Sequence, residues 1–257
     1  MTNKIEIITI PALSDNYIWL IHNSENNLTA AIDPAEAEPV EKILNEKGWE
    51  LNQIINTHHH FDHTNGNYKL KEKWHSQLIA PRMEKSKIPS IDLEVEDNDE
   101  IQIVGLKSKV YHTPGHTLGH VIYYIDCNKI LFAGDTMFSL GCGRVFEGTM
   151  QDMYKSLEKI KAFDPQTKIY CGHEYTESNL AFSIHIDPEN KNLKNLSQQI
   201  MELRKLNKPT LPTNLSIELL CNPFLRTSND AIASKLDCDS QNPLEVFTKL
   251  RKLKDNF

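Results

Sequence analysis

Residues 57–63 read THHHFDH, which places four histidines and one aspartate within seven positions. Imidazole nitrogens and carboxylate oxygens are common protein ligands of zinc and of other divalent cations. If the chain turns here as it leaves a strand, His58 and His60 can face one ion, and Asp62 and His63 can face a neighbouring position. The stretch therefore predicts a metal centre. A solvated histidine-rich turn is the alternative that the rest of the chain has to exclude.

Three later motifs carry further candidate ligands, and each follows a strand-like segment. HTPGHTLGH presents His116 behind a Pro-Gly turn, LFAGDT contains Asp135, and YCGHEY contains His173. Loops that leave strands can converge on one edge of a sheet, so these side chains can join the first cluster. Asp135 can bridge two ions. The predicted ligands of two divalent cations are His58, His60, Asp62, His63, His116, Asp135 and His173.

Strand-like and helix-like patterns alternate along the first part of the chain, and they have to position these ligands. Strands are predicted over KIEIITI, NYIWLIH, LTAAID and ELNQIINTH, and later over EIQIVG, SKVYHTPG, HVIYYID, KILFAGD and TKIYCGH. Helices are predicted over PVEKILNEKG, which stops at Gly48, and over MQDMYKSLEKIKAF, which Thr149 can cap. This alternation predicts the α/β fold class for a layered domain over residues 1–173.

The pattern changes after residue 173. Helical periodicity dominates EYTESNLAFSIHI, ENKNLKNLSQQIMELRKLNK, SNDAIASKL and PLEVFTKLRKLKDNF. A smaller helical domain is therefore predicted over residues 174–257.

Composition excludes several classes of protein. The 257 residues carry a formal net charge of −7, which argues against a general nucleic-acid or anionic-membrane surface. The five cysteines contain no C-x-x-C pair, which argues against a disulfide framework and a zinc ribbon. The N-terminal residues alternate polar and apolar side chains, unlike a secretory signal, and no apolar run is long enough for a membrane span. A cytoplasmic location and a monomer are expected.

The motifs resemble those of the metallo-β-lactamase superfamily, in the same order. The resemblance is closer to one family within it, glyoxalase II, the hydroxyacylglutathione hydrolases. It rests on PALSDNYIWLI, GDTMFSLGCGRVFEG, CGHEYTESNL, NPFLR and LRKLKDNF, and covers essentially the whole chain. It implies an αββα sandwich followed by a helical domain. It also implies hydrolysis of S-D-lactoylglutathione and related thioesters to D-lactate and glutathione, the second step of methylglyoxal detoxification.

The implied chemistry fits the predicted ligands. Two neighbouring cations can lower the pKa of a shared water to near neutral, and the resulting hydroxide can attack the thioester carbonyl. We expect Asp62 and Asp135 to be the catalytic carboxylates among the ligands. The nitrogen and oxygen donors suit zinc first, and iron or manganese also.

Substrate contacts are implied by the resemblance alone. Arg144, Tyr175, Arg251 and Lys254 would contact the glutathione moiety, whose carboxylates attract cations. The alternative for Arg251 and Lys254 is that basic residues near a helix C-terminus complement the helix dipole. Phe146 stands where some family members have tyrosine, which would remove one hydrogen bond of about 1 kcal/mol.

Other functions remain possible from the sequence. A lactonase or β-lactamase of the same fold would keep the metals, whereas a mononuclear iron persulfide dioxygenase would need fewer ligands. A nuclease is disfavoured by the acidic charge. A non-catalytic metal-binding module would differ by having a closed coordination shell.

Overall fold

The computed structural model describes residues 4–257. The chain forms two compact units, one of residues up to 112 with 119–134, and one of residues 113–118 with 135–257. These units do not follow the boundary predicted between residues 173 and 174, which came from the order of sequence patterns and stays a prediction.

The first unit contains a six-stranded sheet. Its strands, in spatial order, are β1 (Ile5–Ala12), β2 (Asn16–Asn23), β3 (Leu28–Ile32), β4 (Gln53–Ile55), β5 (Gln77–Pro81) and β6 (Leu93–Val95). The first three strands pair antiparallel, and β3 to β6 pair in parallel. Parallel neighbours need crossover connections. Here these include α1 (Ala37–Lys47), α2 (Phe61–Thr64), α3 (Asn67–Trp74) and the short 3₁₀ helix η1 (Arg82–Glu84).

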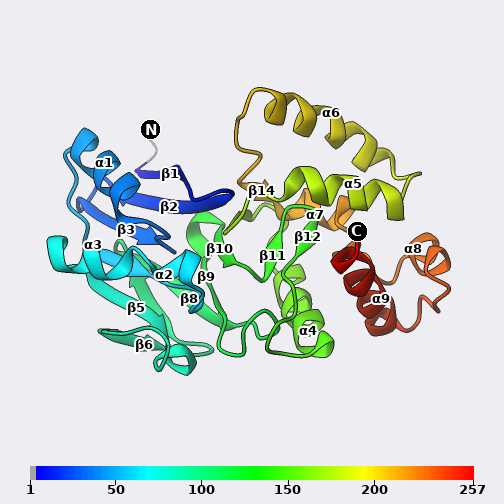
Figure 1. Ribbon diagram of the computed structural model, residues 1–257, viewed down its shortest axis with the longest axis horizontal. Coiled ribbons are helices and arrows are strands. Elements are labelled where there is room, and N and C mark those ends of the chain that lie inside the picture. Colours follow the sequence, from blue (N-terminus) through cyan, green and yellow to red (C-terminus); the bar gives the residue numbers. More distant parts are fainter. Residues whose placement is uncertain (1–3) are drawn as a thin grey trace. The chain divides into compact units, whose positions relative to one another are not determined.

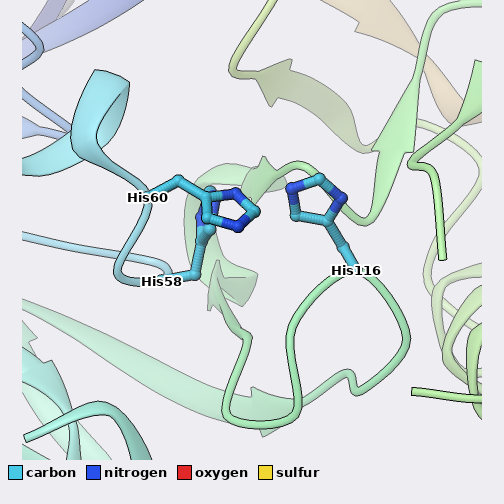
Figure 2. Close-up of side chains that lie close together, drawn as sticks. All are labelled: His58, His60 and His116. Atoms are coloured by element: carbon cyan, nitrogen blue, oxygen red, sulfur yellow. The ribbon is translucent and has the colours of Figure 1, made fainter. Parts of the chain in front are cut away.

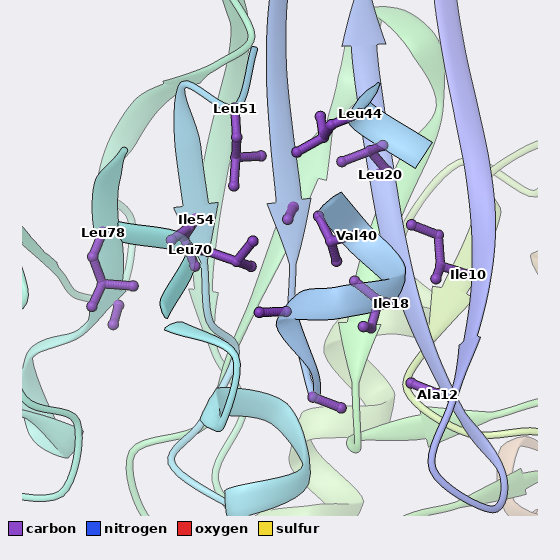
Figure 3. Packing of buried hydrophobic residues seen from close by; sticks show 14 of the residues in the cluster. Ile10, Ala12, Ile18, Leu20, Val40, Leu44, Leu51, Ile54, Leu70 and Leu78 are labelled. Atoms are coloured by element: carbon purple, nitrogen blue, oxygen red, sulfur yellow. The ribbon is translucent and has the colours of Figure 1, made fainter. Parts of the chain in front are cut away.

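Two of these helices cover one face of the sheet. Helices α1 and α3 lie along the sheet (Figure 1). Val40 and Leu44, four residues apart on α1, are fully buried, as expected for the apolar stripe of a helix that packs on a sheet. They join Leu20, Ile54 and the other core residues in Figure 3. The predicted stop of α1 is confirmed, because Gly48 takes a left-handed conformation at its C-terminus.

An antiparallel sheet completes the first unit. It is built from β7 (Glu100–Ile103), β8 (Leu106–His112), β9 (Val121–Ile125) and β10 (Ile130–Gly134), with the 3₁₀ helix η2 (Asp126–Asn128) between the last two. The Tyr123 hydroxyl on β9 donates to the carbonyl oxygen of Asn56 just after β4, at 2.8 Å. This bond fixes the antiparallel sheet against the chain segment that enters the histidine cluster.

The second unit is mainly helical. Its strands are β11 (Met137–Phe138), β12 (Gly141–Cys142), β13 (Lys168–Cys171) and β14 (Thr213–Asn214). Its helices are α4 (Met150–Lys161), α5 (Thr176–Ile186), α6 (Lys191–Lys205), α7 (Leu215–Cys221), η3 (Pro223–Leu225), α8 (Asp230–Lys235) and α9 (Pro243–Asp255). The predicted cap of α4 is confirmed, because Thr149 and Asp152 form a reciprocal capping box.

The helices predicted after residue 173 correspond to α5, α6, α8 and α9. Helix α7 has no predicted counterpart, because seven residues are too short to show a clear helical period. None of the helices among residues 4–257 has the length and apolar character needed to cross a membrane.

Candidate metal centre

The histidine cluster leaves β4 and passes into α2. His58 and His60 direct ring nitrogens at each other, with His58 Nε2 and His60 Nδ1 3.0 Å apart. Figure 2 shows both rings on the loop between β4 and α2, and also shows His116 on the loop between β8 and β9. His58 is fully buried, so its orientation is set by protein atoms.

A buried carboxylate sets the orientation of the cluster. Asp33, which follows β3, accepts hydrogen bonds from the Thr57 backbone N–H at 2.8 Å and from the Thr57 hydroxyl at 2.7 Å. The Thr57 oxygen lies 3.0 Å from His58 Nδ1. Because the hydroxyl proton is directed at Asp33, Thr57 accepts from His58 Nδ1–H. The lone pair on His58 Nε2 is therefore available to a cation.

Asp62 and His63 form the second pair of the cluster. His63 Nε2 lies 3.5 Å from Asp62 Oδ2, and His63 Nδ1 lies 3.2 Å from Asp33 Oδ2. The His63 ring thus lies between two carboxylates, with Nε2 as the nitrogen nearer Asp62 and Nδ1 as the nitrogen nearer Asp33. Asn16 donates to Asp62 Oδ2 at 2.9 Å and holds that carboxylate from β2.

His120, the residue before β9, packs against the cluster. Its ring stacks on the ring of His58, with centroids 4.9 Å apart. Gly134, at the end of β10, has a φ of +47°, and a Cβ there would collide with Thr57 Oγ1 and His120 Nε2. The glycine lets the strand end pass close to the ligand loop. His120 thus supports the ring of His58 through stacking.

The second unit brings together the other three predicted ligands. His116 Nε2 and His173 Nε2 lie 3.4 Å and 3.3 Å from Asp135 Oδ2. Ligand atoms of a tetrahedral zinc site, with bonds of about 2.0–2.1 Å, are about 3.3–3.4 Å apart. Each of the two histidine nitrogens therefore has the separation from the Asp135 oxygen that two ligands of one cation require.

The proton on His116 supports the same conclusion. His116 Nδ1 lies 2.9 Å from the carbonyl oxygen of Arg144, which can only accept, so Nδ1 carries the proton. In a neutral His116 the Nε2 lone pair then faces a carboxylate oxygen of Asp135. Two facing lone pairs repel each other unless a cation lies between them, so this donor set fits a divalent metal ion.

Tyr175 lies beside the last ligand. Its ring stacks on the ring of His173, with centroids 4.7 Å apart and planes within 4° of parallel. The edge of Phe138 contacts it at a centroid distance of 5.1 Å. Tyr175 remains 36% exposed, so a substrate can reach it. Phe146 is 61% exposed and its ring lies beside that of His116.

The basic residues predicted to bind glutathione differ in exposure. The Arg144 side chain is 60% exposed, and its Nε lies 3.8 Å from Asp255 Oδ1. Lys254 lies over the rings of Phe182 and Phe257 and donates to the carbonyl oxygen of Ser178 at 3.3 Å.

Arg251 is almost completely buried, with 4% of its side chain exposed. It donates to the carbonyl oxygen of Cys142 at 2.8 Å and pairs with Asp255 at 3.0 Å. The helix-dipole alternative does not describe this residue, because its guanidinium points into the protein.

The charge of Lys254 is perturbed by its surroundings. Partial burial lowers the pKa of its ammonium group, and the positive charges of Arg251 and Arg144 lower it further. The carboxylate of Asp255 lies among these cations and offsets part of their mutual repulsion.

Several histidines and cysteines have structural surroundings. His22 is buried, stacks on Trp49 with centroids 3.9 Å apart, and burial lowers its pKa. His59 contacts Glu84, and its ring lies edge-on to the rings of His58 and His60. Burial raises the pKa of the Cys171 thiol far above its ordinary value, so this thiol stays protonated.

Sequence patterns missed three residues that support the cluster: Asp33, Thr57 and Asn16. Asp33 follows the strand-like LTAAI directly, so it had the same strand-end signal that identified Asp135. Asn16 has no such signal, because its contact with Asp62 spans 46 residues of sequence.

Comparison with known proteins identifies the family. A family model described as the metallo-beta-lactamase superfamily matches residues 16–173, and one described as the hydroxyacylglutathione hydrolase C-terminus matches residues 174–257. The hydroxyacylglutathione hydrolase of Maricaulis maris is 43% identical over 99% of this chain and 100% of its own length. The hydroxyacylglutathione hydrolase of Brucella ovis is 45% identical over the whole of both chains.

Solved structures confirm the expected α/β fold. The B3 metallo-beta-lactamase BLEG-1 matches with a TM-score of 0.67 at 20% identity, covering 86% of this chain and 99% of its own. ETHE1 from Myxococcus xanthus matches with a TM-score of 0.66 at 22% identity, covering 89% and 87%. The motifs, the ligand geometry and the full-length relatives lead to one conclusion: this chain belongs to the hydroxyacylglutathione hydrolase family of the metallo-β-lactamase superfamily.

Proposed function

We propose that this chain hydrolyses 2-hydroxyacyl thioesters of glutathione, above all S-D-lactoylglutathione, to the 2-hydroxy acid and glutathione. The observation that carries the proposal is the similarity to hydroxyacylglutathione hydrolases over the full length, which spans both the segment with the candidate ligands and the C-terminal helical segment. A β-lactamase or lactonase of the same fold would have no need of a C-terminal segment of this family.

The proposed metal ligands are the seven side chains predicted from the sequence: His58, His60, Asp62, His63, His116, Asp135 and His173. Asp135 is proposed to serve both ions, since two histidines approach the same carboxylate oxygen. Two bound divalent cations would supply Lewis-acid polarisation of the thioester carbonyl and a lowered pKa for water at neutral pH. Zinc suits this donor set, and iron and manganese suit it also.

The protein groups around the ligands hold protons where metal binding needs them. The Thr57 oxygen keeps a proton on His58 Nδ1, and the Arg144 carbonyl keeps one on His116 Nδ1. In its neutral form each ring then has its Nε2 lone pair available to a metal, and these contacts set the orientation of the ring. Asn16 holds Asp62 in the same way.

The thiolate leaving group needs little catalytic assistance from the protein. A thiolate whose conjugate acid has a pKa of about 8.5 can depart without a strong general acid. The chain therefore needs only to bind the glutathione moiety and align the carbonyl. Arg144, Tyr175 and Lys254 have exposed atoms that can meet its carboxylates and peptide groups. Arg251 is proposed to contribute positive charge from its buried position.

The test is direct. Purified protein is incubated with S-D-lactoylglutathione, and loss of the thioester absorbance and release of thiol are followed together, with and without a chelator. We expect turnover that chelation abolishes and added metal restores. A lactone and a β-lactam serve as control substrates. Turnover of either control without turnover of the thioester would contradict the proposal.

We also propose that the protein acts as a cytoplasmic monomer. The cytoplasmic location is supported by the five cysteines, which form no disulfide among residues 4–257. Size-exclusion chromatography with light scattering tests the oligomeric state.

A further inference from the structure

The hairpin formed by β11 and β12, residues 137–142, is held by side chains from distant helices. Asp135 lies two residues before it, and Arg144 lies two residues after it. The backbone carbonyls of residues 138 to 142 each accept a hydrogen bond from a side chain of α5, α9 or the end of α7. A two-residue β-pair has little stability of its own, so these bonds decide where the hairpin lies.

Glu218 on α7 is the centre of this arrangement. Its side chain is fully buried and accepts the Leu140 backbone N–H at 2.8 Å and the Thr213 hydroxyl at 2.7 Å. The Asn222 amide donates to it at 3.0 Å. Burial raises the pKa of Glu218, which is a cost that the four surrounding donors, including Ser139, offset in part.

Two asparagines and a serine hold the carbonyl side of the turn. Asn222 donates to Gly141 O at 3.0 Å, and Asn179 on α5 donates to Ser139 O at 3.0 Å. Ser183, one helical turn after Asn179, donates to Leu140 O at 3.3 Å. A Cβ at Gly141 would collide with the Asn179 amide, so this close approach requires glycine.

Arg251 on α9 holds the end of the hairpin. Its guanidinium donates to Cys142 O, lies over the Phe224 ring with its central carbon 5.2 Å from the centroid, and pairs with Asp255. Its position is therefore set by protein contacts rather than by solvent or by a ligand.

The hairpin is coupled to the ligand Asp135 through direct backbone contact. Gly143 N–H donates to Thr136 O at 3.2 Å, and a Cβ on Gly143 would overlap the carbonyl oxygen of Asp135. A displaced hairpin would therefore displace Asp135 on one side and Arg144 on the other.

We propose that Glu218, Asn179, Asn222 and Arg251 are positioning residues, through which the helical segment sets the place of Asp135 and Arg144. The inference rests on the roles proposed above for those two residues. It extends the role of the helical segment beyond substrate contact, because the segment then determines metal affinity and kcat as well as KM. A misplacement of about 1 Å at a reacting centre can cost about a hundredfold in rate, so such anchoring has catalytic consequences.

The test compares Glu218→Ala with Glu218→Gln. The glutamine keeps an acceptor for Leu140 N–H, and the Thr213 hydroxyl can turn to accept from the new amide. Three quantities are measured: hydrogen exchange of the segment around residue 140, metal affinity by chelator competition, and kcat with KM for S-D-lactoylglutathione. In Glu218→Ala we expect faster exchange, and losses of about tenfold or more in metal affinity and kcat. In Glu218→Gln we expect all three within about threefold of wild type.

The matched control is Arg226→Met. It breaks a buried ion pair with Asp187 in the same helical region, and among residues 4–257 no hydrogen bond joins either residue to the hairpin. It should lower thermal stability while leaving exchange around residue 140, metal affinity and kcat close to wild type. If Glu218→Ala does not fold, Asn179→Ala serves in its place, with the same changes at about threefold or more.

Unchanged exchange in Glu218→Ala would overturn the inference, as would fast exchange with metal affinity and kcat equal to those of Arg226→Met. A wild-type protein without thioesterase activity would contradict the proposed function instead, and the exchange and metal measurements would still decide the inference.

Discussion

Asp135 is approached by two of the histidines predicted to bind metal, His116 and His173. Two histidine nitrogens approach its Oδ2 at distances that match the edge of a metal coordination polyhedron. His120, by contrast, contacts the metal-ligand candidate His58 through ring stacking and has a supporting place. The two residues therefore offer a clear comparison between a ligand and a residue behind a ligand.

We expect Asp135→Ala to lower kcat at least about tenfold more than His120→Ala, because outer residues of metal sites typically contribute only about 10–100-fold. Elemental analysis should also show metal lost from Asp135→Ala. Steady-state kinetics with saturating metal checks the first claim. Similar kcat values in the two variants would mean that Asp135 is not a shared ligand.

Helix α9 presents basic residues in different directions. Arg251 is buried, Lys254 is half-buried three residues later, and Lys252 is exposed. Residues three apart share a helix face, so the charges of Arg251 and Lys254 lie on one side of α9, whereas Lys252 is exposed.

Lys254→Ala should raise KM for the glutathione thioester and leave kcat nearly unchanged, because binding remote from the carbonyl is equal in ground and transition states. Removal of one charge-assisted contact should raise KM by about tenfold. Arg251→Ala should also lower kcat, because the Cys142 carbonyl loses its donor.

Lys252→Ala is the internal control, and a small thioester without the peptide is the control substrate. Lys252→Ala should leave kcat/KM close to wild type with either substrate. Lys254→Ala should leave kcat/KM close to wild type with the small thioester. If Lys252→Ala and Lys254→Ala behave alike, the basic end of α9 only complements the helix dipole.

The lowered pKa of Lys254 gives a pH dependence. Burial is the main cause, followed by Arg251 and Arg144 on the same side, with Asp255 as the nearby counter-charge. Because the folded-state pKa is depressed, Lys254 loses its charge at a lower pH than an ordinary lysine as pH rises. Binding of an anionic peptide should therefore weaken on the alkaline side, beginning below pH 10.5.

Lys254→Arg keeps its charge throughout this range. The inhibition constant of an S-alkylated glutathione, measured against pH for wild type and Lys254→Arg, should diverge as pH rises. Parallel curves for the two proteins would exclude Lys254 as the titrating contact.

The net charge of the whole chain differs in sign from the charge of one local group of residues. The formal net charge is −7, yet Arg144, Arg251 and Lys254 bring positive charge to one place in the second unit. Net charge therefore excludes a general anion-binding surface while a small anionic substrate still finds its contacts.

Fully loaded protein should contain two metal ions per chain, because seven ligands suffice for two sites of four or five ligands with shared donors. Chelation should lower the melting temperature, since a ligand that binds only the native state stabilises it by mass action. Elemental analysis and thermal denaturation provide the measurements. Metal content that stays at one equivalent after supplementation would contradict the two-ion proposal.

The sequence alone predicted the types of the candidate ligands, their order and the strand-like segments that precede them. It also predicted the α/β class, α1 with its glycine stop, the Thr149 cap of α4 and most of the later helices. These features depend on residues near each other in the chain, and side-chain periodicity reports local structure of this kind directly.

Only the tertiary structure decided the contacts between distant residues. Asp33 meets Thr57 across 24 positions, and Arg251 meets Cys142 across 109. In the sequence, Arg251 and Lys254 look alike as basic residues of one helix, yet one is buried and the other half-exposed. The reason is physical: a buried polar group needs a partner, and packing supplies whichever donor or acceptor the fold brings there. A local sequence pattern does not show which distant residue will be the hydrogen-bond partner.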